Sequence, residues 1–174
     1  MLFRRQERSA RCSALPEDAL KYQIPGAQWS IEFPLEIIAR LSGFAQKGWR
    51  SKEAVGQLYS SDLTGKVLRV ERVTKLPAKW ASYSGVRLDL DAVAHDRERQ
   101  FAEGFHCLGF WHSHPESCPE PSPADLVMAA DHARAGKQDF QGLIFIIVGN
   151  TAPPDGFGVW VHDGEKAWRA VVAG

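Results

Sequence analysis

The chain has 174 residues, of which 44% are hydrophobic and 24% charged, and these values are typical of one globular domain with its own apolar core. Its 21 basic and 21 acidic side chains cancel, so no overall field favours binding to nucleic acid or to an anionic membrane. No stretch approaches the roughly 18 apolar residues that a membrane-spanning helix needs.

Two further features of the sequence bear on the compartment in which the protein works. The basic N-terminal end is not followed by an apolar run of signal-peptide length, so secretion is not supported. The cysteines, Cys12, Cys107 and Cys118, are odd in number and form no C-x-x-C pair, which argues against a disulfide framework. Together these features predict a cytoplasmic protein.

The first third of the chain is predicted to hold a leader, a strand and a helix. Residues 1–25 mix charge with Ser, Pro and Gly without a sustained period, which predicts a loosely ordered leader or a partner-contacting arm before a single domain over 26–174. The domain then begins with a strand over Trp29–Phe33. Pro34 opens a helix whose apolar residues recur at helical spacing as far as Phe44.

The remaining elements follow from period and from turn residues. Strands are predicted over Glu53–Ser60 and Lys66–Leu76, and Pro77–Gly85 is predicted to be a loop. The later elements are a helix from Asp89 or Asp91 to Gly104, a strand over Phe105–Trp111, a helix over Pro123–Ala135, a buried strand over Leu143–Val148, and a closing pair over Phe157–His162 and Ala167–Val172. This order predicts the α/β class, with a mixed sheet flanked by helices.

The run HSHPESCPEPSPAD contains two histidines, His112 and His114, separated by one residue. In extended backbone, residues i and i+2 project from the same face, so both imidazoles can reach one cation. Zinc accepts histidine nitrogen and prefers about four ligands, of which a catalytic site leaves one for water. An H-x-H pair alone is more often a pair of surface residues than a metal site.

The end of the same run is also a good helix start. Ser122 at the N-cap, Pro123 at the first helical position and an acid at Asp125 together form a cap that needs no catalytic role. The two interpretations are compatible, because a carboxylate in the first turn of a helix is held rigidly. Asp125 is therefore a candidate third ligand beside His112 and His114.

These residues resemble a known family. His112-x-His114, seven further residues and Ser122-x-x-Asp125 match in order and spacing the motif of the JAMM metallopeptidases of the JAB/MPN superfamily. The family pattern also has an upstream E-x-x-G-x-L strand, and the chain contains it at Glu53–Leu58. The resemblance runs from about Trp29 to the C-terminus and implies a three-layer, cytidine-deaminase-like architecture.

The resemblance implies a role for each motif residue. His112, His114 and Asp125 would hold one Zn²⁺ per chain, with water as the fourth ligand. Glu53 would be the general base that moves the proton from water to the leaving amine, and Ser122 would donate a hydrogen bond to the oxyanion. Family members that have lost ligands act as scaffolds, whereas this sequence keeps the full set.

The substrate is implied only by resemblance. Bacterial JAMM proteins of similar length are encoded beside ubiquitin-activating-like and conjugating-like enzymes in antiphage systems, which implies cleavage after the C-terminal glycine of a ubiquitin-like protein. Substrate contacts are predicted between the base and the ligands, at Trp80, Tyr83 and Arg87. Other relatives process sulphur-carrier proteins or cell-wall peptides, and a catalytically silent scaffold in a larger assembly is the remaining alternative.

Two other chemistries compete for the same run of residues. His114-Pro115-Glu116 is an H-x-E, as in nucleobase deaminases, but the P-C-x-x-C that those enzymes require is absent. Cys118 lies near the histidines and could be a nucleophile, although a loop cysteine is the preferred interpretation because the metal set already uses those histidines.

Overall fold

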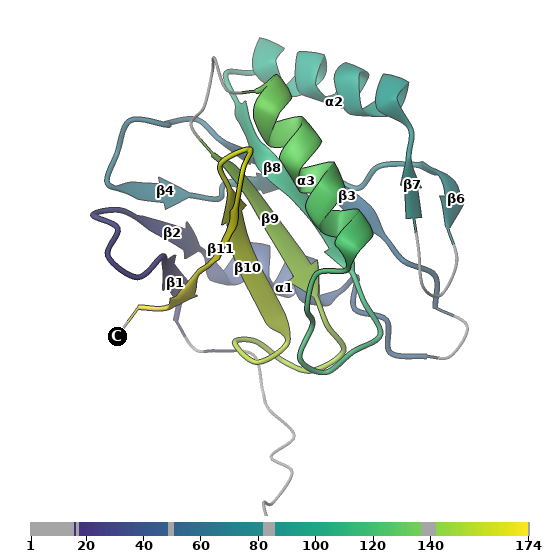
Figure 1. The fold of residues 1–174 in the computed structure, drawn as a ribbon, viewed down its shortest axis with the longest axis horizontal. Coiled ribbons are helices and arrows are strands. Elements are labelled where there is room, and N and C mark those ends of the chain that lie inside the picture. The colour runs from purple at the N-terminus through teal and green to yellow at the C-terminus, as the bar shows by residue number, and fades with distance from the viewer. Residues whose placement is uncertain (1–15, 17, 49–50, 82–85, 137–141, 174) are drawn as a thin grey trace, which may run out of the picture.

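The structure is a computed structural model that describes residues 16, 18–48, 51–81, 86–136 and 142–173, and Figure 1 draws the others in grey. Its elements in chain order are β1 (Leu20–Gln23), β2 (Ser30–Phe33), α1 (Leu35–Ser42), β3 (Val55–Ser60), β4 (Val67–Arg69), β5 (Arg72–Val73), β6 (Ala78–Ala81), β7 (Val86–Leu88), α2 (Leu90–Ala102), β8 (His106–Ser113), α3 (Pro123–Ala135), β9 (Leu143–Val148), β10 (Phe157–His162), β11 (Ala167–Arg169) and β12 (Val171–Val172).

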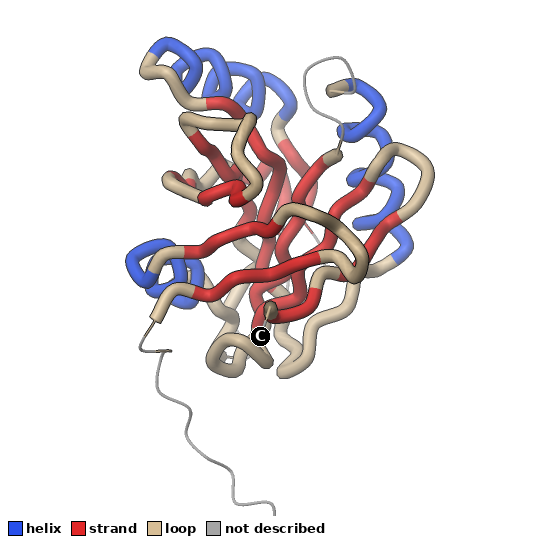
Figure 2. Tube along the Cα trace, turned by 90° about the vertical axis from the view of Figure 1, so that its left-hand side faces the viewer, coloured by secondary structure: helices blue, strands red, loops and turns tan. Residues whose placement is uncertain are grey.

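The centre of the fold is a six-stranded sheet with the order β11-β10-β9-β8-β3-β5, in which β8 and β9 are parallel and the other pairs antiparallel. A four-stranded sheet, β12-β1-β2-β4, lies beside it, and β6 and β7 form a separate pair. Figure 1 shows α3 in front of the central strands and α1 behind them, and Figure 2 shows the two helices on opposite sides of the strands. The predicted α/β class with mixed sheets and flanking helices is confirmed.

Strand β9 explains why the central sheet is buried on both faces. Its residues Ile144, Ile146 and Val148 pack into the core shared with α1 and the smaller sheet. The alternate residues, Phe145 and Ile147, pack on the other face, in the core that α2 and α3 cover. Because side chains alternate along a strand, a run that is apolar at every position buries both faces of its sheet.

The pairing of β3 with β8 contains a bulge. Leu58 is opposite Gly109, but Tyr59 is opposite Cys107, so Leu108 has no partner on β3. Gly109 has a φ of +149°, and a Cβ at this position would lie 1.8 Å from the carbonyl oxygen of Ile144. The bulge therefore requires glycine at position 109.

A different steric contact explains why the E-x-x-G-x-L motif has glycine at position 56. A Cβ on Gly56 would lie 1.8 Å from the carbonyl oxygen of Thr74, which accepts a hydrogen bond from the indole of Trp111 at 2.9 Å. The motif glycine thus permits the close approach of β3 to the segment that follows β5.

Helix α2 is attached to the central sheet by a buried carboxylate, Asp96. It accepts hydrogen bonds of 2.5–3.0 Å from four side chains, those of Gln57, Tyr59, Thr74 and Arg99. Burial alone would raise the pKa of Asp96, but these hydrogen bonds outweigh burial and hold the pKa below its usual value.

Most predicted elements are confirmed, including the bounds of α3, β9 and β10, while four segments differ. The predicted closing strand Ala167–Val172 divides into β11, which pairs with β10 in the central sheet, and β12, which pairs with β1 in the smaller sheet. Leu20–Gln23, expected within the loosely ordered leader, form β1 and pair with β2 and β12. The predicted strand Lys66–Leu76 divides into β4 and β5 because the chain passes from the smaller sheet to the central one. The predicted loop Pro77–Gly85 begins with strand β6, which pairs with β7.

We expect Asp96→Asn to lower the free energy of unfolding at pH 7 by roughly 1–3 kcal/mol, because the amide cannot accept all of these hydrogen bonds. A lowered folded-state pKa contributes stability above the ordinary Asp pKa of about 3.9, and that contribution is lost as the pH falls through the folded value. The difference between parent and variant should therefore narrow below about pH 4. Urea unfolding across this pH range measures it, with exposed Asp131→Asn as the control. A difference that stays constant down to pH 3 would contradict this role for Asp96.

Candidate metal centre

The motif residues meet at the end of β8 and the start of α3. His112 is the second-last residue of strand β8 and lies opposite Val55 of β3. His114 follows the strand, and its backbone N–H donates a hydrogen bond to the carbonyl of Val148 at 2.9 Å. The predicted strand ended at Trp111, whereas β8 continues to Ser113, so the first histidine lies within the strand. Both imidazoles are buried.

The ligand atoms of His112, His114 and Asp125 converge. The Nε2 atoms of the two histidines are 3.1 Å apart, and the Asp125 carboxylate oxygens lie 3.3 Å from Nε2 of His112 and 3.6 Å from Nε2 of His114. All three ligand atoms lie within 4.8 Å of one another. Two imidazole nitrogens facing each other beside a carboxylate are the nitrogen and oxygen donors that zinc accepts.

Asp125 is held in place by the helix cap that its sequence predicts. Ser122 Oγ accepts from the backbone N–H of Asp125 at 3.2 Å, and the Asp125 carboxylate accepts from the backbone N–H of Ser122 at 2.7 Å, which is a complete capping box. Burial would raise the pKa of Asp125, but the contacts with His112 and Ser122 outweigh it and hold the pKa well below its usual value. The carboxylate is therefore ionised, as a metal ligand must be.

His114 is suited to metal binding in its protonation state as well as its position. Burial and the neighbouring His112 lower the pKa of His114, although the carboxylates of Glu116 and Asp125 oppose this. A lowered pKa favours the neutral imidazole, which is the form that binds a metal.

Glu53 lies beside this cluster, immediately before β3. The antiparallel register pairs Val55 with His112, so Glu53 comes opposite His114, and its Oε1 is 3.9 Å from Nε2 of that histidine. Burial raises the pKa of Glu53 to about 7; His112 lowers it, whereas Asp125 and Glu116 raise it further. A buried carboxylate whose pKa lies near 7 can both accept and release a proton at neutral pH.

The family of prokaryotic homologs of the JAB domain matches residues 31–170. The chain belongs to this family. The solution structure of protein DSY2949 from Desulfitobacterium hafniense has the same fold as this JAB domain, with a TM-score of 0.61, 20% identity and coverage of 80% of this chain and 88% of that one. At this identity the likeness shows the fold alone. No curated protein matches the chain significantly.

The JAB domain holds Glu53 next to the histidines through residues that the sequence analysis did not identify. The buried hydroxyl of Ser113, the middle residue of H-x-H, accepts from the backbone N–H of Ala54 at 2.9 Å, and the Ser113 N–H donates to the Ala54 carbonyl at 2.9 Å. Gln46 donates to the Ser113 carbonyl at 2.8 Å. The sequence shows Ser113 between the two histidines, but it does not show the partners of Ser113, which lie 59 and 67 residues away in the chain.

The outer nitrogens of the two histidines have different surroundings. Nδ1 of His114 lies 3.1 Å from a carboxylate oxygen of Glu116. Nδ1 of His112 is buried and has no hydrogen-bond partner among the described residues. In the sequence Glu116 stands out only as part of a deaminase-like H-x-E, whereas in the structure its carboxylate contacts His114.

The predicted substrate contacts have different outcomes. Trp80 and Arg87 are opposite each other in the β6–β7 pair, and their side chains are not described, while Tyr83 lies outside the described residues. Cys118 is exposed and unpaired, as expected of a loop cysteine. The substrate-binding role of Trp80, Tyr83 and Arg87 remains a prediction.

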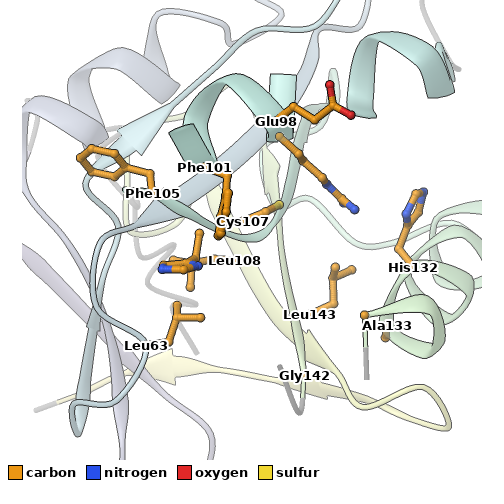
Figure 3. Close-up of a pocket in the computed structure, with 13 residues that line it drawn as sticks. Leu63, Glu98, Phe101, Phe105, Cys107, Leu108, His132, Ala133, Gly142 and Leu143 are labelled. Carbon is orange, nitrogen blue, oxygen red and sulfur yellow. The ribbon is translucent and has the colours of Figure 1, made fainter. Parts of the chain in front are cut away.

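A large cavity lies at the other end of β8, away from the metal centre. Its volume is about 820 Å³, and Figure 3 shows His132 and Ala133 of α3 on one side and Phe101 of α2 on another, with Cys107 and Leu108 between them. His132, which follows Asp125 on the same helix, packs against Phe110 with the ring centroids 4.5 Å apart and the ring planes tilted by 58°. It therefore belongs to this cavity and not to the ligand set.

Within the described residues, no helix has the length and hydropathy that a membrane crossing demands.

We expect metal-free Glu53→Gln to gain stability relative to the parent as the pH rises. An acid whose folded-state pKa is raised keeps its proton in the folded protein between pH 4.5 and about 7 while the unfolded chain ionises, so a folding cost builds up across this range and stays constant above it. Glutamine resembles the protonated acid and avoids that cost. Chemical unfolding from pH 4.5 to 8 in the presence of a chelator measures the difference. Exposed Glu36→Gln is the matched control, and an equal pH-dependent gain in that variant would contradict a special environment for Glu53.

Proposed function

We propose that the protein is a zinc-dependent peptidase or isopeptidase. The observation that carries this proposal is the arrangement of Glu53 beside the ligand set: a buried carboxylate with a pKa of about 7 lies 3.9 Å from the imidazole of His114. JAB-domain proteins include metallopeptidases as well as inactive members. A scaffold has no need of a buried, proton-exchanging carboxylate at this place.

Zinc fits the donor set better than a hard cation does. Two imidazole nitrogens and one carboxylate match the three protein ligands of catalytic zinc sites, whereas magnesium and calcium prefer oxygen ligands throughout. When bound, zinc supplies Lewis acidity that lowers the pKa of water to about 7 and polarises a carbonyl oxygen. His112, His114 and Asp125 are the residues that would hold it.

Glu53 carries the proton in this proposal. As a carboxylate it accepts a proton from the attacking water, and as an acid it gives this proton to the departing amine of the cleaved amide. Its pKa of about 7 makes both transfers accessible at neutral pH. The hydrogen bonds between Ser113 and Ala54 hold the neighbouring Glu53 opposite His114.

Ser122 is positioned to stabilise the charge that develops on the carbonyl oxygen. Its oxygen accepts from the backbone N–H of Asp125, and its hydroxyl hydrogen has no acceptor among the described residues. A donor held in place before the reaction needs no reorganisation in the transition state. The cap thus bonds the Ser122 oxygen to the residue that would be the third metal ligand, which supports this role.

We further propose that the substrate is the C-terminal tail of a ubiquitin-like protein, cleaved after its final glycine during precursor processing or removal of conjugates. The resemblance to bacterial JAMM proteins encoded with ubiquitin-activating-like and conjugating-like enzymes supports this, and those enzymes would be its partners in antiphage defence. Among the described residues β6 and β7 form a sheet of only two strands. Its edges can pair with an extended peptide.

The proposal predicts different losses for the base and for a ligand. Glu53→Ala should keep stoichiometric zinc but lose cleavage by at least about 10²-fold, because the proton carrier is removed. His112→Ala should lose both zinc and cleavage. Metal analysis of the purified proteins, combined with hydrolysis of a ubiquitin-like fusion whose junction follows a glycine, separates the two variants.

The same assay identifies the alternatives. A parent protein with neither stoichiometric zinc nor chelator-sensitive cleavage would be a scaffold. Cleavage of an unrelated peptide in preference to the fusion would retain the peptidase and reject the ubiquitin-like substrate. Glu53→Ala that cleaves at the parent's rate would reject the assigned base.

A further inference from the structure

Glu116 is an exposed residue on a firmly held backbone. Its side chain is 56% exposed, yet the chain around it is bonded to the loop that follows β9. The Asn150 backbone N–H donates to the Glu116 carbonyl at 2.9 Å. The side chain of Asn150 donates to the Pro115 carbonyl, and Thr151 Oγ1 donates to the Ser117 carbonyl at 2.6 Å.

These bonds hold three consecutive carbonyls, those of Pro115, Glu116 and Ser117. Surface loops usually leave such groups to water. Here they fix the direction in which the Glu116 side chain leaves the backbone, and that side chain reaches Nδ1 of His114 at 3.1 Å. The order of contacts therefore runs from Asn150 and Thr151, through the 115–117 backbone, to the carboxylate and then to the imidazole.

The contact matters because a histidine ligand needs its proton on the nitrogen that faces away from the metal. A carboxylate at Nδ1 accepts the Nδ1–H bond, leaves the Nε2 lone pair free and fixes the plane of the ring. His112, the other histidine, has no such partner at Nδ1 among the described residues. Its ring is held instead by burial within β8.

We propose that Glu116 is a positioning residue that fixes the tautomer and ring orientation of His114, and that Asn150 and Thr151 act on metal affinity through it. This inference rests on the proposed metal site and concerns how tightly that site holds its ion. It assigns no catalytic step to Glu116, which contacts a ligand and not the reacting atoms.

The direct test is the zinc dissociation constant of purified protein, measured by competition with a chromogenic chelator. Glu116→Ala should weaken zinc binding about 10–100-fold, the effect usual for losing such a partner. Glu116→Gln keeps an acceptor oxygen without the charge, so its affinity should lie between those of the parent and Glu116→Ala. The melting temperature of the metal-free variants should equal the parent's, because the side chain is exposed and outside the core.

Glu120 offers a matched control on the same loop. Its side chain is 59% exposed and pairs with Arg169 instead of a histidine. Glu120→Ala removes the same charge at a similar exposure, so it should leave zinc affinity unchanged. A loss equal to that of Glu116→Ala would mean that charge alone causes the effect, and would overturn the proposal.

The role of the loop after β9 is tested by a double-mutant cycle. Asn150→Ala should weaken zinc binding in the parent, by less than Glu116→Ala does, and should have no further effect when Glu116 is already alanine. Additive losses would show that Asn150 acts by another route. A parent that binds no zinc would refute the proposed function itself, whereas tight binding in both the parent and Glu116→Ala would refute only this inference.

Discussion

The site depends on the register between β3 and β8. Pairing Val55 with His112 brings Glu53 opposite His114, and the two bonds between Ser113 and Ala54 lock the strands at this point. Because side chains alternate along a strand, a slip of β3 by one residue would turn Glu53 to the other face of the sheet, away from the histidines. The hydrogen bonds of the sheet therefore hold Glu53 beside the histidine pair.

The second constraint is a helix cap with two uses. Capping boxes ordinarily stabilise a helix start, and that of α3 does so through Ser122 and Asp125. The same bonds restrict both side chains to one orientation at the open side of the histidine pair. The stability of the helix start and the placement of Asp125 thus share one cause.

Much of this arrangement was predictable because its signals are local. The bounds of α3 follow from Ser122 and Pro123 at its start and Gly136 at its end, and β9 is apolar throughout. The H-x-H and S-x-x-D residues are close in sequence, so Asp125 could be named as a candidate third ligand from the sequence. Glu53 is far upstream and could be assigned only by resemblance, although the structure then places it at the cluster.

The missed features all depend on contacts between distant segments. Strand β1 is four residues long with only Tyr22 fully buried, and its neighbour β12 comes from the other end of the chain, so its short sequence carries no alternation signal. The break between β4 and β5 is invisible because apolar residues continue across it while the chain changes sheets. The hydrogen bond between the backbones of Asn150 and Glu116 joins two loops. Neither loop sequence shows that the two loops are in contact.

The bulge at Leu108 gives β8 two independently registered halves. The half that ends at His112 keeps one pairing with β3, and the half that begins at His106 keeps another, offset by a residue. The first carries the metal centre and the second lines the large cavity between α2 and α3. The bulge therefore lies between the part of β8 that carries the histidines and the part that lines the cavity. One strand thus places the candidate ligands at one of its ends and a wall of the cavity at the other.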